Sequence, residues 1–168
     1  MAVTQQLARV TEAYLARCRA SAAANADADP EWYPPDDDWI DLDWAPRPLV
    51  HACELAGVRP RLLEALQRAV GGDLDVDVSM LRHPEATGSF GPPPTALAPD
   101  SVARVAAGLA ELDWEEVWAA IPEGRRGTVV GDGFTGDQLA YLAEHFTALR
   151  EFYLDAARRG LSVVLWWD

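Results

Sequence analysis

Lysine is absent from this sequence, and all fourteen of its basic residues are arginine. Schiff-base formation, a lysine general base and the phosphate-binding lysine of P-loop proteins all need the missing side chain. These three chemistries are therefore excluded. The arginine-only composition, rich in alanine and proline, is also typical of a GC-rich genome, so it indicates no function by itself.

Cysteine is scarce and long apolar runs are missing. Cys18 and Cys53 do not form a Cys-x-x-Cys pair and lie in segments of helical periodicity, so we expect two buried free thiols. No run approaches the roughly 18 apolar residues of a membrane-spanning helix, and the opening MAVTQQLARV has no signal-peptide core. We therefore expect a cytoplasmic protein. Its length and its nearly half apolar composition predict one domain, residues 1–168.

Complete catalytic and metal-binding motifs are also missing. There is no His-Glu-x-x-His, no Gly-x-Gly-x-x-Gly and no zinc-ligand spacing among the histidines and cysteines. GSFG at 88–91 lacks the first glycine of a nucleophile elbow. DLDVDV at 73–78 begins like a calcium loop but has valine where that loop needs glycine. We therefore expect no cofactor, no metal ion and no identifiable catalytic residue, and the sequence leaves open whether the protein is an enzyme.

The segment that the sequence specifies best is the C-terminal one. Five apolar residues spaced three or four apart predict one long amphipathic helix: Leu139, Leu142, Phe146, Leu149 and Tyr153. Thr135 and Gln138 have the spacing of a capping box at its start, and Gly160 suits the left-handed position after its end. The following LSVVLWWD is apolar on both of its alternating faces, which predicts a central strand covered on both sides.

The upstream segments predict the remaining elements. We expect a first strand within 3–10 and helices near 11–22, 47–56, 60–70, 102–109 and 113–121. Residues 73–80 and 128–130 are candidate short strands, whereas 25–43, 83–99 and 123–135 have the composition of loops. The predicted fold class is α+β: a small sheet joining the N- and C-terminal strands, surrounded by helices including one long C-terminal amphipathic helix.

An acidic and aromatic segment at 25–43, here called the acidic arm, is a candidate interaction surface. It contains eight acidic residues, no basic residue and three prolines. Its aromatic residues are Trp32, Tyr33 and Trp39, and Trp44 follows it directly. We expect the arm to lie against the body of the protein. Aromatic anchors supply affinity and charge steers association, so the arm predicts a basic protein as partner.

The net charge of −13 sets limits on other partners. An acidic protein repels phosphate groups, so we expect no nonspecific binding to nucleic acid and none to anionic membranes. The charge is compatible with solubility alone or with the basic protein partner suggested by the acidic arm. The sequence leaves the oligomeric state open.

His51 is the candidate for chemistry. It is nearly the only polar side chain on the helix predicted at 47–56, which we expect to be buried almost all round. Asp41 and Asp43 precede this helix and would share a face if the chain were extended. A neutral imidazole that donates to a carboxylate would satisfy burial, and the same pair could act as a general base or as half of a metal site. The structural and the functional interpretations of His51 both stay open.

Three blocks of the sequence resemble the YfbM-like proteins, a bacterial family of unknown function. DWIDLDWAPRPLVHACEL resembles their block containing Asp-Leu-Asp and Ile-His-Phe-Leu-Leu. GSFGPPPTALAPDSVARVAAGLAELD resembles their Gly-Tyr-Gly-Pro-Ala-Arg block and the helix after it. LAEHFTALREFYLDAARRGLSVVLWWD resembles their C-terminal block closely. The blocks occur in the family's order, and the resemblance implies a single-domain α+β fold with no established activity.

The resemblance and the residue patterns together give a set of candidates for ligand or partner binding. They are Asp41, Asp43, His51, Phe90, Gly91, Pro92, Trp39, Trp44, Tyr141 and Trp166. The chain also departs from the family. Trp44-Ala45-Pro46 replaces a Lys and a Trp, Ala98 replaces a helix-capping Thr, and Pro93-Pro94 replaces Ala-Arg. If the family's Lys and Arg bind a ligand, this protein has lost that ligand.

Two hypotheses of function follow. The first is a non-enzymatic protein-interaction module, acidic and cytosolic, which neutralises a basic partner in the manner of an immunity protein. The second is a small-molecule-binding protein or enzyme that uses His51 with Asp41 or Asp43. A concave pocket lined by these residues would favour the second hypothesis. A flat acidic face, with His51 packed in the core, would favour the first.

Overall fold

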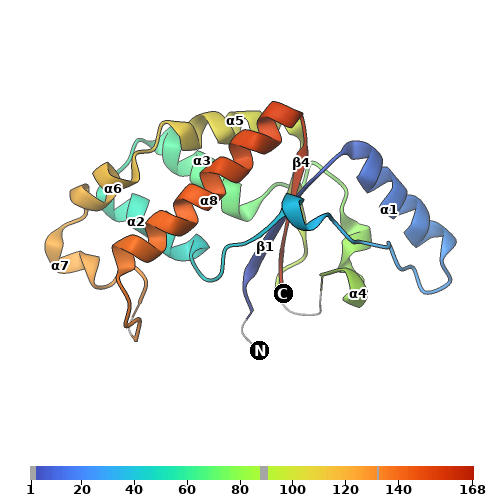
Figure 1. Ribbon diagram of the computed structural model, residues 1–168, viewed down its shortest axis with the longest axis horizontal. Helices are drawn as coiled ribbons and strands as arrows, with labels where there is room; N and C mark the ends of the chain where they lie inside the picture. The colour runs from blue at the N-terminus through green and yellow to red at the C-terminus, as the bar shows by residue number, and fades with distance from the viewer. Residues whose placement is uncertain (1–2, 88–90, 132) are drawn as a thin grey trace.

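A computed structural model describes residues 3–87, 91–131 and 133–168 (Figure 1). Its centre is an antiparallel sheet with the strand order β2-β1-β4-β3. The strands among the described residues are β1 (Gln5–Val10), β2 (Trp39–Asp41), β3 (Thr95–Leu97) and β4 (Ser162–Trp167). The terminal strands β1 and β4 pair along their whole length. The predicted α+β fold, with a small sheet that joins the two ends of the chain, is confirmed.

β4 lies inside the sheet because both of its faces are apolar. Val163 and Leu165 contribute to one core cluster, and Val164 and Trp166 contribute to another on the opposite face. Each of these four side chains is at most 3% exposed. The predicted central strand, covered on both sides, is therefore confirmed.

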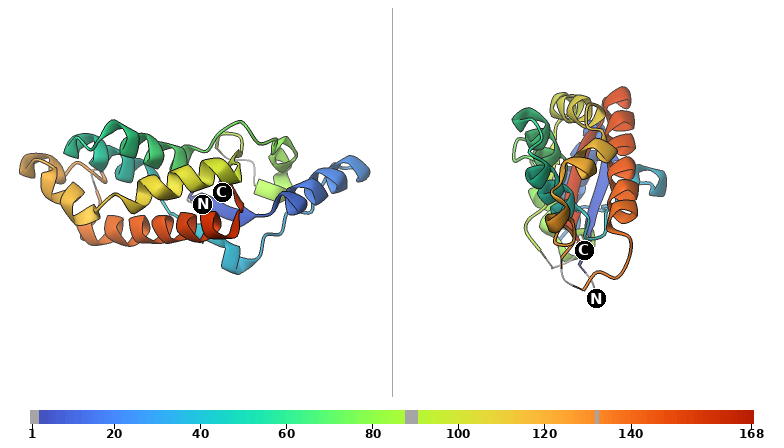
Figure 2. Two further views of the ribbon diagram at one scale, coloured as in Figure 1. Left: turned by 90° about the horizontal axis from the view of Figure 1, so that it is seen from above. Right: turned by 90° about the vertical axis from the view of Figure 1, so that its left-hand side faces the viewer.

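Helices cover both faces of the sheet (Figure 2). The described helices are α1 (Glu12–Ala24), α2 (Pro46–Ala56), α3 (Pro60–Gly71), α4 (Pro84–Thr87), α5 (Pro99–Ala110), α6 (Trp114–Ala120), α7 (Glu123–Arg126) and α8 (Gln138–Arg159), with the short 3-10 helices η1 (Asp36–Asp38) and η2 (Ser79–Arg82). The larger core cluster joins one face of the sheet to α2, α3, α5, α6 and α8. The smaller cluster joins the other face to α1, η2 and the acidic arm.

α8 is the long C-terminal helix that the sequence predicts. Phe146 and Tyr153 on its inner face are fully buried, and Gly160 ends the helix in the left-handed conformation with φ 65°. The capping box predicted at Thr135 is wrong, because the N-cap is Asp137, whose carboxylate accepts a backbone hydrogen bond from the first turn. In the described part of the chain, no helix is both long and apolar enough to cross a membrane.

The acidic arm lies against the second face of the sheet, as the sequence predicts. Trp32 is only 5% exposed and packs edge-on against Trp166, with ring centroids 5.8 Å apart. Asp38 in η1 forms ion pairs with Arg9 in β1, at 2.8 Å, and with Arg159 at the end of α8. The arm is therefore anchored at two points, one apolar and one ionic.

The strand predicted at 73–80 is wrong. The segment makes one isolated bridge, between Asp73 and Ala96, and then turns into η2. The Asp73 carboxylate accepts the backbone N–H of Leu74, and the Asp77 carboxylate accepts that of Ser79. Aspartates that bond to nearby backbone groups favour turns over strands, which explains the failure of the alternating pattern.

Two further segments differ from prediction. Residues 128–130 form turns and not a strand, and the Thr128 hydroxyl donates to the Arg125 carbonyl at 2.8 Å. The loop predicted at 83–99 contains β3, the edge strand that pairs with β4, and it also contains α4. β3 is only three residues long, which is too short for an alternating pattern to reveal it.

Candidate functional site

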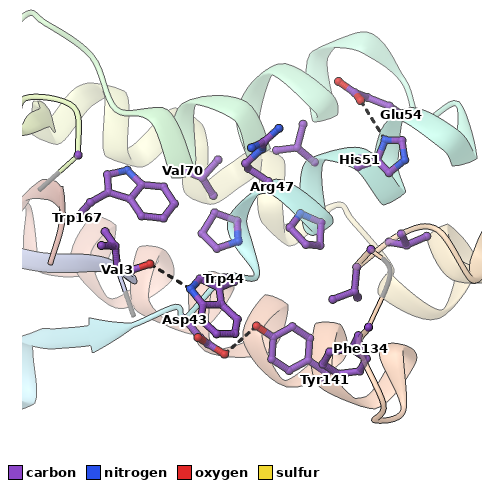
Figure 3. Close-up of a pocket in the computed structure, with 18 of the residues that line it drawn as sticks. Val3, Asp43, Trp44, Arg47, His51, Glu54, Val70, Phe134, Tyr141 and Trp167 are labelled. Carbon is purple, nitrogen blue, oxygen red and sulfur yellow. Dashed lines mark hydrogen bonds and ion pairs between the residues drawn. The ribbon is translucent and has the colours of Figure 1, made fainter. Parts of the chain in front are cut away.

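A pocket of about 1300 Å³ lies between α2, the start of α8 and the end of β4 (Figure 3). Its aromatic side chains, among the described residues, are Trp44, Phe134, Tyr141 and Trp167. Its ionisable side chains, in the same part of the chain, are Asp43, Arg47, His51 and Glu54, with Tyr141. The pocket therefore combines apolar walls with a small number of charged groups, as ligand-binding sites do.

A tight turn after β2 places Asp43 and Trp44 at the pocket. The backbone N–H of Asp43 donates to the Asp41 carboxylate at 2.7 Å, and its carbonyl accepts from Gln5 at 3.1 Å. These two bonds hold Asp43 in the left-handed region, with φ 51°. Aspartate tolerates this conformation better than most residues. The turn leaves Trp44 58% exposed, with its indole N–H donating to the Val3 carbonyl at 3.1 Å.

Asp43 and Tyr141 join β2 to α8 at the bottom of the pocket. The Tyr141 hydroxyl donates to Asp43 Oδ2 at 2.9 Å. Burial, followed by this hydrogen bond and by the negative charge of Asp43, raises the pKa of Tyr141 to about 12. The Phe134 ring lies 5.1 Å from the Tyr141 ring and extends the aromatic wall towards the loop before α8.

α2 supplies the opposite wall. Pro46 begins the helix, where its missing N–H costs nothing. The prediction that this helix is buried almost all round is wrong, because Arg47 and Glu54 are exposed and His51 is half-buried. His51 Nδ1 lies 3.6 Å from a Glu54 carboxylate oxygen. Its expected contact with Asp41 or Asp43 is not formed among the described residues, although Asp43 and His51 line the same pocket.

Gly91 and Pro92 close the pocket next to the end of β4. Gly91 has φ 94°, and a Cβ at this position would lie 2.7 Å from Cβ of Trp167. Only glycine therefore lets this segment pass so close to the strand. The candidates that the structure brings together in the pocket are Asp43, Trp44, His51, Gly91, Pro92 and Tyr141.

Three other candidates lie outside the pocket, and Phe90 lies outside the described residues. Asp41 accepts from the Thr4 hydroxyl at 3.1 Å, in addition to capping the turn. The Trp39 indole N–H donates to Gln6 at 2.7 Å, and its ring packs on that of Trp166, 5.6 Å away. Trp166 itself is buried. None of these three side chains lines the pocket.

Sequence reasoning missed Arg47, Phe134 and Trp167 as pocket residues. Trp167 could have been found, because strand alternation puts it on the face opposite to Trp166. Phe134 lies in a glycine-rich loop with no periodicity, and Arg47 stands in a Pro-Arg-Pro segment that carries no specific signal. Among the described residues, no group of three His, Cys, Asp or Glu side chains could hold a metal ion.

Comparisons with known proteins bear on the fold. No family model matches the sequence, and no curated protein matches it. The fold resembles that of YfbM from Escherichia coli. The crystal structure of YfbM, a protein of unknown function, matches 96% of this chain and 98% of its own, with a TM-score of 0.54 and 14% sequence identity.

The likeness to YfbM confirms, at the level of the fold, the resemblance to YfbM-like proteins that the three sequence blocks indicated. It spans nearly the whole chain, from β1 to β4. Because the identity is 14%, it carries no information about a ligand or an activity. Any function must therefore be argued from the pocket and the surface of this chain.

Proposed function

We propose that this is a binding protein and that its ligand occupies the pocket between α2, α8 and the end of β4. The main support is the convergence of four aromatic side chains, from four separate parts of the chain, on one open cavity. Small-molecule sites usually have volumes of roughly 300–1000 Å³. At about 1300 Å³, this pocket is larger, so it suits an elongated ligand or one that fills only part of it.

The arrangement supports binding better than proton transfer. The pKa of Tyr141, raised to about 12, keeps its phenol protonated at neutral pH, so the hydroxyl serves as a donor and not as a base. Asp43 already accepts that proton in a hydrogen bond. The His51 and Glu54 side chains face each other and are partly exposed, at 39% and 49%, so water weakens their coupling.

A small-molecule screen by ligand-observed NMR tests this proposal. Binders should compete with one another, and Trp44→Ala should weaken them by about tenfold or more, because it removes an exposed aromatic wall. Tyr33→Ala is the matched control, since Tyr33 is also an exposed aromatic residue, at 72%, but is absent from the pocket. If Trp44→Ala and Tyr33→Ala affect every binder equally, the pocket is not the binding site.

A basic protein partner at the acidic arm remains a second candidate. The part of the arm that is open to a partner includes Tyr33, together with Asp36 and Asp37 of η1, all of them exposed. Asp38 is engaged by Arg9 and Arg159, and Trp32 is buried. The exposed surface of the arm is thus smaller than the sequence suggests, but it keeps two exposed aromatic side chains, Tyr33 and Trp39, among carboxylates.

Association kinetics test the acidic arm. Asp36→Asn with Asp37→Asn should lower the on-rate of a basic partner recovered from the host, and salt should lower it further, because charge steers the encounter. Glu115→Gln with Glu116→Gln, on the exposed side of α6, is a control that removes the same charge elsewhere. A partner whose on-rate is insensitive to salt and to the arm substitutions would contradict the role of the arm.

A further inference from the structure

One corner of the pocket indicates which chemical class of ligand it selects. Asp43 and Trp44, which are neighbours in the chain, both line this corner, and the Tyr141 hydroxyl donates to the Asp43 carboxylate (Figure 3). We infer that this corner binds an organic cation, an ammonium group carried on an apolar body; the inference rests on the proposed function. Aromatic faces attract cations, tryptophan most strongly, and a carboxylate adds direct charge pairing.

The polar edge of the Trp44 indole is occupied, which leaves the face of the ring for a ligand. The indole N–H is already bonded to the Val3 carbonyl, so it is not free to donate to a ligand. The bond also fixes the orientation of a side chain that is 58% exposed. A fixed, exposed indole in the same pocket as a carboxylate is suited to the recognition of ammonium groups.

One carboxylate oxygen of Asp43 can still accept a hydrogen bond from a ligand. Tyr141 occupies Oδ2, and no described residue donates to Oδ1. The carboxylate is half-buried, so its hydration is incomplete and an incoming cation compensates for the loss of water. The left-handed turn at Asp43, held by Asp41 and Gln5, keeps the carboxylate in place before any ligand arrives.

The charges of the pocket and of the whole molecule both favour a positively charged ligand. Asp43 and Glu54 give the described part of the pocket two carboxylates against the single guanidinium of Arg47. The whole protein carries a net charge of −13. A field of this sign concentrates cations at an open cavity and repels anions.

Arg47 opposes cation binding and so provides a variant with the opposite effect. Figure 3 places Arg47 on the α2 side of the pocket, away from Asp43. Replacing Arg47 by a neutral residue should strengthen the binding of a cation, while replacing Asp43 should weaken it.

The first test compares choline with its uncharged analogue, in which carbon replaces the quaternary nitrogen. Calorimetric titration of the wild-type protein should show choline binding about tenfold or more tightly than the analogue, because the analogue has the same shape but no charge. Phenylacetate, an aromatic anion, should bind more weakly than phenethylamine. Equal affinities of choline and the carbon analogue would overturn the inference and leave the proposed function standing.

The second test uses three substitutions. Asp43→Asn keeps a residue that tolerates the left-handed turn and should weaken choline binding about tenfold. Trp44→Leu keeps an apolar side chain without a π face and should have a similar effect. Arg47→Gln should strengthen binding severalfold. Circular dichroism and thermal melting report whether each variant is folded, and folded variants that all bind choline like the wild type would contradict the inference.

A third titration identifies the source of the ammonium group. The same chemistry occurs in a free amine and in a methylated lysine side chain, so a peptide containing trimethyllysine is titrated beside choline. Binding of choline alone points to a free metabolite, and much tighter binding of the peptide points to a modified protein. If neither binds and the library screen finds only neutral or anionic pocket ligands, the cation inference fails while the proposed function survives.

Discussion

At the residue scale, the pocket depends on the turn that presents Asp43. The sequence suggests that Asp41 and Asp43 share one face of an extended segment, and the structure separates them. Asp41 accepts the backbone N–H of Asp43 at 2.7 Å, which bends the chain into the left-handed region. A local bond between a side chain and the backbone competes with extended structure, and the pattern of the sequence does not show which one wins.

Tyr141 gives a prediction that depends on pH. Its pKa is about 12 in the folded protein, above the roughly 10 expected in an unfolded chain. The folded state therefore holds the phenolic proton more tightly, and the resulting stability is fully present below about pH 10 and is lost as the pH rises towards about 12. Tyr141→Phe removes this dependence.

Urea unfolding of the wild type and of Tyr141→Phe at several alkaline pH values measures the difference. The wild type should be the more stable protein at pH 8, and the gap should narrow between about pH 10 and 12. Tyr153 also has a raised pKa, caused by burial, but it is present in both proteins and cancels in the comparison. A gap that stays constant with pH would mean that folding does not raise the pKa of Tyr141.

At the element scale, α8 and β4 could be predicted because their patterns are long. The helix has six buried side chains with regular spacing, and the strand is apolar from Val163 to Trp167. β3, by contrast, has three residues and is defined by pairing with β4, not by its own sequence. The start of α8 was predicted two residues early because Thr135 and Asp137 are both good N-cap residues.

Phe146 tests the packing of α8. It is fully buried and stacks on Trp114 of α6, with ring centroids 5.2 Å apart. Phe146→Ala should lower the free energy of unfolding by roughly 3–5 kcal/mol, because it removes a large side chain from a closed core. Thr147→Ala, on the exposed face of the same helix, should change it by less than about 0.5 kcal/mol. If denaturant unfolding shows that Phe146→Ala lowers the free energy of unfolding by less than about 1 kcal/mol, the buried face of α8 has been assigned wrongly.

Asp38 tests the ionic anchor of the acidic arm. Hydrogen bonds from Arg159, and then from Arg9, hold the pKa of Asp38 below its usual value. Its side chain is 16% exposed, so Asp38→Asn should cost about 1–3 kcal/mol at neutral pH. Because the pKa is lowered, this stability is present above the usual carboxyl range and is lost as the pH falls through the folded pKa.

Asp36→Asn is the control for this prediction, since Asp36 is exposed in the same short helix. Unfolding of the three proteins between pH 2 and pH 7 measures the effect of each substitution. The difference between the wild type and Asp38→Asn should shrink in acid. Equal stability of the two variants at neutral pH would show that the arm does not depend on Asp38.

At the scale of the whole molecule, the architecture follows from the sequence and the pocket does not. Patterns of apolar residues act over neighbouring turns and strands, so they predict the helices, the terminal strands and the α+β class. The pocket is assembled from Val3, the turn at Asp43 and Trp44, α2, the glycine-rich loop at Phe134, and Trp167. Apart from the turn and α2, which follow one another directly, these segments are far apart in the sequence, and the pairing of β1 with β4 brings Val3 and Trp167 together.

The likeness to YfbM is also informative about the whole molecule, because it concerns the overall fold. It supports the order and arrangement of the elements over almost the whole chain. The features on which the proposed function rests are individual side chains at the edge of that fold. Their role must be tested in this protein directly.

The most direct test of the central claim is NMR detection of the indole N–H signals of the seven tryptophans during ligand titration. Choline, or any pocket ligand from the screen, should shift the signals of Trp44 and Trp167 in a saturable manner. Trp32 and Trp114, which are buried elsewhere, should not respond. Saturable shifts confined to Trp32 and Trp114, or binders that leave Trp44 and Trp167 unchanged, would contradict the pocket as the binding site.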